Sequence, residues 1–155
     1  MTSLTVLPPF TGKTYDDLLA DVAARIAEEP ARLDMRWWVL MKDGSRWVAP
    51  RGLYTISTPA CGTVACVGGW MDIRLGSTIH GMLVCDVLDV GSISATAWGS
   101  LFDSAVFNKK GDYVLVYDEQ YVPIVLARLA AFRRTHAKSL KTPLPTPSEL
   151  TTETP

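Results

Sequence analysis

The sequence has no excess of positive charge. Its 15 lysines and arginines are matched by 16 aspartates and glutamates, so the net charge at pH 7 is −1. General binding to nucleic acid needs a basic surface that neutralises phosphates, and this composition disfavours it. The basic residues near the C-terminus are therefore interpreted as a solvated helix end that complements the helix dipole. These residues are Arg128, Arg133, Arg134, His136, Lys138 and Lys141.

Cysteine is also scarce. The three cysteines are an odd number and are widely spaced, which is not the pattern of a secreted disulfide framework. The first residues contain neither the basic segment nor the apolar segment of a secretory leader. No apolar run reaches the roughly 20 residues that span a bilayer. We therefore expect a cytoplasmic protein that does not bind membranes.

What the sequence does contain is a long run with almost no charge, residues 59–70. Apolar and small side chains recur at helical spacing on more than one side of this run. The spacing predicts a helix over about 62–75 that is buried on all sides. Its N-terminus would lie at Cys61 or Gly62, where free backbone N–H groups and the helix dipole favour an anion.

The other elements are predicted from caps, periodicity and turn residues. Helices are expected from Thr14 to about Glu29, from Ser92 or Ser94 through Phe102, and from near Tyr121 onward. Two β-hairpins are expected, over 37–49 around Asp43-Gly44 and over 105–117 around a turn at 108–112.

The predicted fold class is α+β. It consists of a helix-dominated single domain, with the buried helix at its centre and the two β-hairpins at its periphery. Residues 1–13 are expected to form an N-terminal arm and residues 14–139 the globular domain. Residues 140–155, rich in proline, threonine and serine, are expected to be a disordered tail.

Two segments carry a family resemblance. Arg32-Leu33-Asp34-Met35-Arg36-Trp37 and the later Cys61-Gly62-Thr63-Val64-Ala65-Cys66-Val67-Gly68-Gly69-Trp70 resemble a group of small uncharacterised actinobacterial and actinophage proteins. Those proteins carry an F-D-M-x-x-W segment followed by C-G-T-x-x-C-x-x-G-W, and the match covers most of 14–136. The hairpin at 37–49 looks like an insertion between the motifs. The resemblance implies an accessory protein encoded by a phage or derived from one, and no catalytic activity.

Cys61 is a candidate nucleophile. A cysteine at the start of a buried helix can have a lowered thiol pKa, and a histidine can complete the catalytic pair. Cys61-Gly62-Thr63 distantly resembles the motif of papain-like cysteine hydrolases. His80 is the candidate base and Asp86 could orient it. A cysteine-dependent hydrolase or transferase is therefore the alternative function, against a structural role for Cys61.

A structural zinc site is a further alternative. Its four soft ligands would be Cys61, Cys66, His80 and Cys85. Cys61 and Cys66 are five residues apart, which places them roughly 140° apart around a helix, so they would diverge. Ordinary buried thiols are the favoured interpretation. With no phosphate-binding loop or dinucleotide fingerprint in the sequence, we expect no cofactor or metal.

The strongest binding signal is the tryptophan-rich hairpin. Trp37, Trp38 and Trp47 crowd one short segment, and alternate residues of a strand point to opposite faces. At least one tryptophan would therefore face away from the core, beside Arg36 and Arg46, which is the composition of an interaction hot spot. The favoured function is a non-enzymatic accessory protein that binds another protein or a second copy of itself, in host cytoplasm if a phage encodes it.

Overall fold

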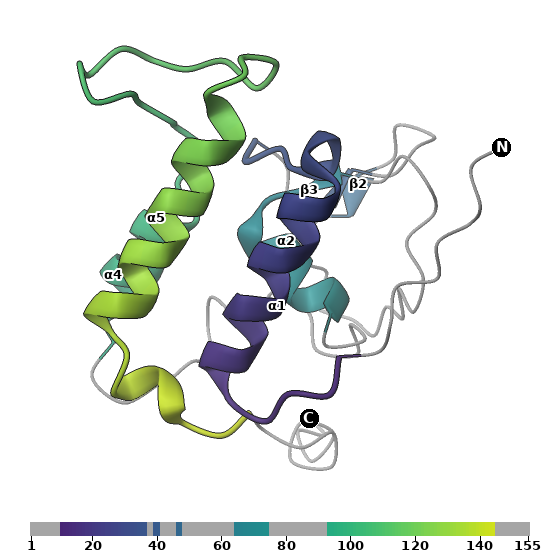
Figure 1. The fold of residues 1–155 in the computed structure, drawn as a ribbon, viewed down its shortest axis with the longest axis vertical. Coiled ribbons are helices and arrows are strands. Elements are labelled where there is room, and N and C mark those ends of the chain that lie inside the picture. The colour runs from purple at the N-terminus through teal and green to yellow at the C-terminus, as the bar shows by residue number, and fades with distance from the viewer. Residues whose placement is uncertain (1–9, 37–38, 41–45, 48–63, 75–92, 145–155) are drawn as a thin grey trace, which may run out of the picture.

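The computed structural model describes residues 10–36, 39–40, 46–47, 64–74 and 93–144. Its helices are α1 (Tyr15–Glu28), α2 (Val67–Arg74), α4 (Ala95–Leu101) and α5 (Tyr121–Thr135), with 3-10 turns η1 (Pro30–Arg32) and η2 (Ser139–Lys141). The longest two, α1 and α5, lie side by side, with α2 and α4 behind them (Figure 1). Of the helices described, none is long and apolar enough to cross a bilayer.

The helix α1 begins where the sequence predicts. The Thr14 side chain accepts a hydrogen bond from the backbone N–H of Asp17, and the Asp17 carboxylate accepts one from the backbone N–H of Thr14. Both hydrogen bonds of a capping box are therefore present. The residues that recur at helical spacing along α1 are buried, and they are Leu18, Leu19, Val22 and Ile26. This apolar stripe gives α1 its place at the centre of the described core.

The helices α1 and α5 are antiparallel. At one end, Arg133 Nε donates to Asp16 Oδ1 over 2.9 Å. At the other end, the hydroxyl of Tyr121 accepts the backbone N–H of Met35, just beyond α1, over 2.9 Å. The predicted start of α5 near Tyr121 is confirmed, with its buried stripe at Val125, Leu129 and Phe132. Ser94 caps α4, as one of the two predicted positions.

The predicted central helix over 62–75 is partly wrong. Val64–Ala65 forms strand β3, and α2 begins only at Val67. Cys66 stands at the helix start, where its sulfur accepts the N–H of Gly69 over 3.3 Å and its carbonyl accepts the N–H of Trp70. The N-terminus is therefore not at Cys61 or Gly62. Pairing of β3 with another strand overrides the helical spacing of 64–65.

The buried character of this region is confirmed. Cys66, Val67, Trp70 and Met71 are all buried. Arg74 is buried as well, and its charge is paired with Asp21 on α1 through two hydrogen bonds. A buried charge needs such a partner, so the polar end of α2 is tied to α1 and not to solvent.

The predicted fold class, α+β with two peripheral β-hairpins, is wrong. The described residues are dominated by helix, and the strands among them have two residues each. These strands are β1 (Val39–Leu40), β2 (Arg46–Trp47) and β3, in the antiparallel order β2-β1-β3. The middle of the predicted first hairpin, 41–45, lies outside the described residues. Strands this short do not form a layer of the fold.

The second predicted hairpin reduces to one isolated bridge, between Phe107 and Tyr113. Strand pairing stops there because the N–H of Asp118 bonds back to the carbonyl of Leu115 and turns the chain. On the other side of the bridge, Asn108 closes a side-chain-capped turn. Residues 102–120 are therefore a long, hydrogen-bonded loop between α4 and α5.

The packed unit continues past residue 139, the predicted end of the globular domain. Leu140 in η2 is fully buried. The N–H of Tyr15 donates to the carbonyl of Thr142, and the N–H of Leu144 donates to the carbonyl of Lys13. The chain after α5 thus returns to the start of α1 and closes that end of the helix pair. Residues 145–155 lie outside the described part.

Replacing Leu140 tests this closure. Leu140→Ala removes a fully buried side chain, so it should lower the free energy of unfolding by about 2–4 kcal/mol. Lys141→Ala, at the exposed neighbour, should change it by less than about 0.5 kcal/mol. Urea unfolding followed by circular dichroism measures both. A loss for Leu140→Ala that is as small as the loss for Lys141→Ala would show that the return segment does not stabilise the fold.

A pH effect follows from the α1 cap. Hydrogen bonds from the N–H groups of Lys13 and Thr14 lower the pKa of the Asp17 carboxyl below its ordinary value. Because the folded pKa is the lower one, the stabilisation is present above the unfolded pKa and is lost as the pH falls through the folded pKa.

We therefore expect Asp17→Asn to lose less stability than the parent protein between about pH 5 and about pH 3. Urea midpoints at the two pH values give the comparison. Asp112→Asn, which removes one exposed carboxylate elsewhere, serves as the control for the change in net charge. An unchanged pH slope in Asp17→Asn would mean that the cap does not couple to folding.

Candidate functional site

The predicted tryptophan surface lies mostly outside the described side chains. Trp37 and Trp38 are outside the described residues. Arg46 and Trp47 form strand β2, of which the structure gives the backbone pairing. Arg36 is the predicted binding residue whose side chain is described, and about half of it is exposed.

The residues of the predicted cysteine chemistry also lie mostly outside the described part of the chain. Cys61, His80, Cys85 and Asp86 all lie outside the described residues. Cys66, the fourth member of the alternative zinc set, is buried at the start of α2. Within the described ranges, no three histidine, cysteine, aspartate or glutamate side chains gather where they could hold a metal ion.

A different exposed surface is present on the loop between α4 and α5. Four large apolar side chains stand out from it, with exposed fractions of 51% for Phe107, 53% for Tyr113, 45% for Leu115 and 82% for Tyr117. We call these four residues the aromatic loop surface. Every large apolar side chain that is exposed to this degree within the described residues belongs to it.

The loop that carries this surface is held by internal contacts. Val106 and Val114 are buried, and the N–H of Val114 donates to the carbonyl of Val106 over 2.8 Å. The rings of Phe107 and Tyr113 meet edge to face with centroids 5.8 Å apart. Two inward valines thus anchor the loop, while the residues beside them are turned outward.

The turn of the loop is closed by Asn108. Its Oδ1 accepts the N–H groups of Lys110 and Asp112, over 2.9 and 3.0 Å. Between them Gly111 has φ +83°, the left-handed region that a residue without Cβ adopts at little cost. A second side-chain cap at Asp118, which accepts the N–H of Gln120, leads into α5. The backbone of the loop is therefore held by hydrogen bonds within the chain itself.

Arg128 fastens the loop to α5. Its guanidinium donates to the carbonyls of Asp103 and Ala105, over 2.8 and 2.7 Å. The sequence pattern predicts that Arg128 belongs to a solvated helix end with five other basic residues, and for Arg128 that prediction is wrong. Arg133 is also used internally, through its ion pair with Asp16. Backbone carbonyls leave no signature in a sequence, so this role of Arg128 had no signal there.

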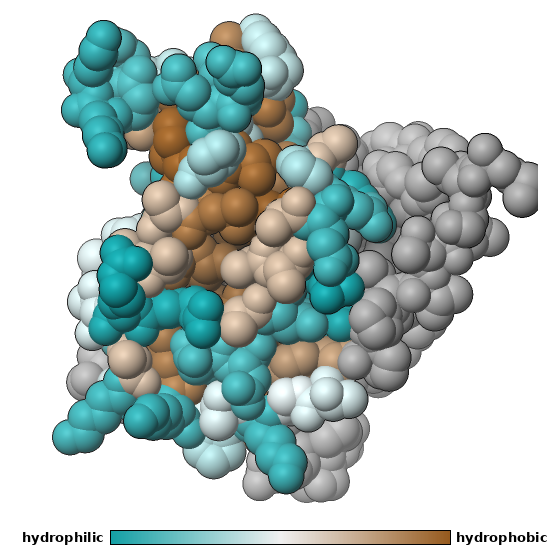
Figure 2. All heavy atoms as spheres, viewed as in Figure 1, coloured by the Kyte–Doolittle hydropathy of each residue, from teal (hydrophilic) through white to brown (hydrophobic). Residues whose placement is uncertain are grey.

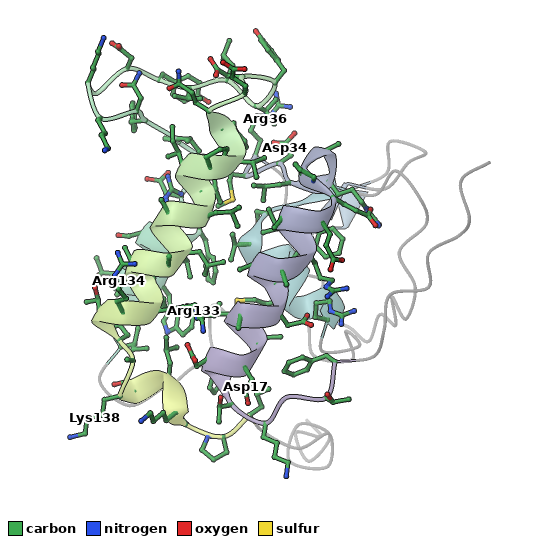
Figure 3. The ribbon with its side chains drawn as sticks, viewed as in Figure 1. Asp17, Asp34, Arg36, Arg133, Arg134 and Lys138 are labelled. Carbon is green, nitrogen blue, oxygen red and sulfur yellow. The ribbon has the colours of Figure 1, made fainter. Side chains whose placement is uncertain are left out.

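Arg36 lies near the start of α5, the end from which the loop extends, with Asp34 beside it (Figure 3). Its Nε and Nη2 donate to the two carboxylate oxygens of buried Asp34, over 2.9 and 2.7 Å. This hydrogen-bonded pair raises the pKa of Arg36, with smaller contributions from Tyr121 and Tyr113. The guanidinium is therefore fixed by Asp34, within electrostatic reach of Tyr113 on the aromatic loop surface.

Tyr121 ties this segment to α5. Its buried hydroxyl accepts the N–H of Met35, and burial raises its pKa above the ordinary value for tyrosine. The residues on either side of Met35 are Asp34 and Arg36, so one hydrogen bond positions the Asp34–Arg36 pair against the helix. The site is thus built by residues from two parts of the chain that are 86 positions apart.

Comparison of the chain with protein-family models, with curated proteins and with solved structures found no match. The geometry of the described residues is therefore the basis for any function assigned to this surface. This surface has exposed aromatic rings and an oriented guanidinium, which are side chains enriched at protein interfaces.

Removing the Tyr121 hydroxyl tests how the segment is held. Tyr121→Phe leaves the buried N–H of Met35 without its acceptor, so it should cost about 1–3 kcal/mol of unfolding free energy. Tyr117→Phe removes the same hydroxyl at an exposed position and should change it by less than about 0.5 kcal/mol. Thermal and urea unfolding of both variants provide the measurement. A neutral Tyr121→Phe would mean that the hydrogen bond does not hold Met35.

Proposed function

We propose that this chain is a non-enzymatic protein that binds another protein through the aromatic loop surface and Arg36. The observation that carries the proposal is the exposure of Phe107, Tyr113, Leu115 and Tyr117 on a loop that is already ordered. Tyrosine, phenylalanine and arginine are enriched at the centres of protein interfaces. A soluble domain gains nothing in folding energy by holding such side chains in water.

The order of the loop supports a binding role. Ordering a loop on association costs about 0.5–1.5 kcal/mol for each immobilised side chain. Here the Asn108 turn, the buried valines and the Arg128 contacts fix the backbone in the free protein. Tyrosine adds large contact area with only two side-chain torsions to restrict, as in antibody loops.

The setting of this function rests on the sequence alone. The resemblance to actinobacterial and actinophage proteins supports a phage-encoded accessory protein that acts on a host or phage protein in the host cytoplasm. Trp37, Trp38, Trp47 and Arg46 remain predicted contacts, from their composition. No observation on the described residues favours a cysteine-dependent enzyme.

A photo-crosslinking experiment tests the proposal. Benzoylphenylalanine in place of Tyr117, the most exposed aromatic residue, should give a discrete adduct with one partner in an actinobacterial host. The same group in place of Ala31, exposed on η1, is the control and should not give that adduct. Mass spectrometry of the adduct identifies the partner.

Affinity for the purified partner then provides the decisive measurement. Tyr113→Ala and Tyr117→Ala should each weaken binding by roughly 30-fold, as expected for hot-spot residues. Lys109→Ala, at the exposed turn of the same loop, should change it by less than about threefold. Equal crosslinking at Tyr117 and Ala31, or affinity unchanged in both tyrosine variants, would overturn the proposal.

A further inference from the structure

The outward face of the α1–α5 pair is unusually poor in charge. On α5, Pro123, Ala127 and Ala131 are exposed and follow one another at helical spacing. The neighbouring stripe, Val122, Leu126 and Ala130, is only half-buried. A surface helix of a monomer normally places charged and polar residues on this side.

The facing side of α1 has the same character. The stripe that contains Asp16 continues through Ala20, Ala23 and Ala27, of which Ala27 is exposed and the other two are half-buried. Because Asp16 pairs with Arg133, this stripe borders the half-buried stripe of α5. Figure 2 shows the result as an apolar band that runs between the two helices on the face turned to the viewer.

The two ends of this band differ in the sign of their net charge. Beside the end of α5, Arg134, Lys138 and Lys141 are exposed, and Figure 3 shows Arg134 and Lys138 there. Asp17, which caps α1, is the exposed acid at this end. Beside the start of α5, Asp118 and Glu119 are exposed next to the helix, and the nearby Arg36 is paired with Asp34. The loop before them also exposes Asp112, Lys109 and Lys110, which leaves this end with an excess of acids.

We infer that this face binds a second copy of the chain, in an antiparallel arrangement about a two-fold axis. Such an axis places the basic end of one α5, with Arg134 and Lys138, against the acidic end of the other, with Asp118 and Glu119. The same contact is then made twice, as in every isologous dimer. The two α5 dipoles also oppose each other in this orientation. A partner of one charge sign would match only one end of the band.

The small side chains fit a helix as the occupant. Alanines at 23, 27, 127 and 131 let a second helix approach toward the lower end of the usual 8–10 Å interaxial distance. The half-buried Val122 and Leu126 then lose their remaining exposure to water, which provides the favourable free energy. The inference stands on a different surface from the aromatic loop surface and does not depend on partner binding there. A dimer of this kind presents one aromatic loop at each end.

Sedimentation equilibrium of the full chain over a range of concentrations tests the inference. The protein should dimerise, and Ala127→Glu should raise the dimer dissociation constant more than tenfold, since it places an unpaired charge in the contact. Ala131→Glu is a second variant on the same face. Both positions are exposed, so circular dichroism should show an unchanged helix content. Thr96→Glu, exposed on α4 behind the helix pair, is the control and should leave the constant unchanged.

A charge exchange distinguishes this geometry from other dimers. Arg134→Glu alone should weaken the dimer several-fold, and Arg134→Glu with Glu119→Lys in the same chain should restore it. A monomer at every concentration would overturn the inference and leave the band to a different protein or a lipid surface. A dimer that is insensitive to Ala127→Glu and Ala131→Glu, or not restored by the exchange, would overturn it as well.

Discussion

The packing of α1 against α5 is the constraint on which the described part of the molecule depends. The buried stripe of α1 has to be covered, and α5 covers one side while α2 covers another. Polar contacts then fix both ends of the pair: Asp16 with Arg133 at one end, and Met35 with Tyr121 at the other. The return of the chain through Leu140 closes the first end. Each of these contacts has a defined geometry because the packing of α1 against α5 fixes the positions of the backbones that carry the contacting groups.

The sequence predicts the long helices because their signals are local. Thr14 and Asp17 make the cap of α1 from residues three positions apart, and the stripes of α1 and α5 repeat at helical spacing. The start of α2 could not be predicted in this way. Residues 64–65 have a helix-compatible pattern, but they pair with Val39–Leu40, more than 20 positions away. Tertiary pairing of this kind overrides local preference and leaves no periodic signal.

The sequence predicts only part of the aromatic loop surface. Tyr113, Leu115 and Tyr117 alternate with Val114 and Val116, which indicates two faces without showing which one is covered. The alternation suggested a hairpin, yet the valines face inward and the turn at Leu115–Asp118 ends the pairing. The position of Arg36 at the start of α5 could not be predicted either. It follows from a hydrogen bond between residues that the sequence separates by 86 positions.

The same helix supports both surfaces, and its composition explains how. The inward stripe of α5 builds the core, Arg128 holds the loop, and Arg133 holds α1, so the charged side chains of its middle are directed to internal partners. What remains on the outward face is proline and alanine. Along its middle, such a helix presents no exposed charge to solvent, and its exposed charges lie in the last turn, at Arg134, and beyond its ends. The proposed association along the band and the proposed recognition at the loop therefore involve separate side chains, and a substitution in one surface should leave the other intact.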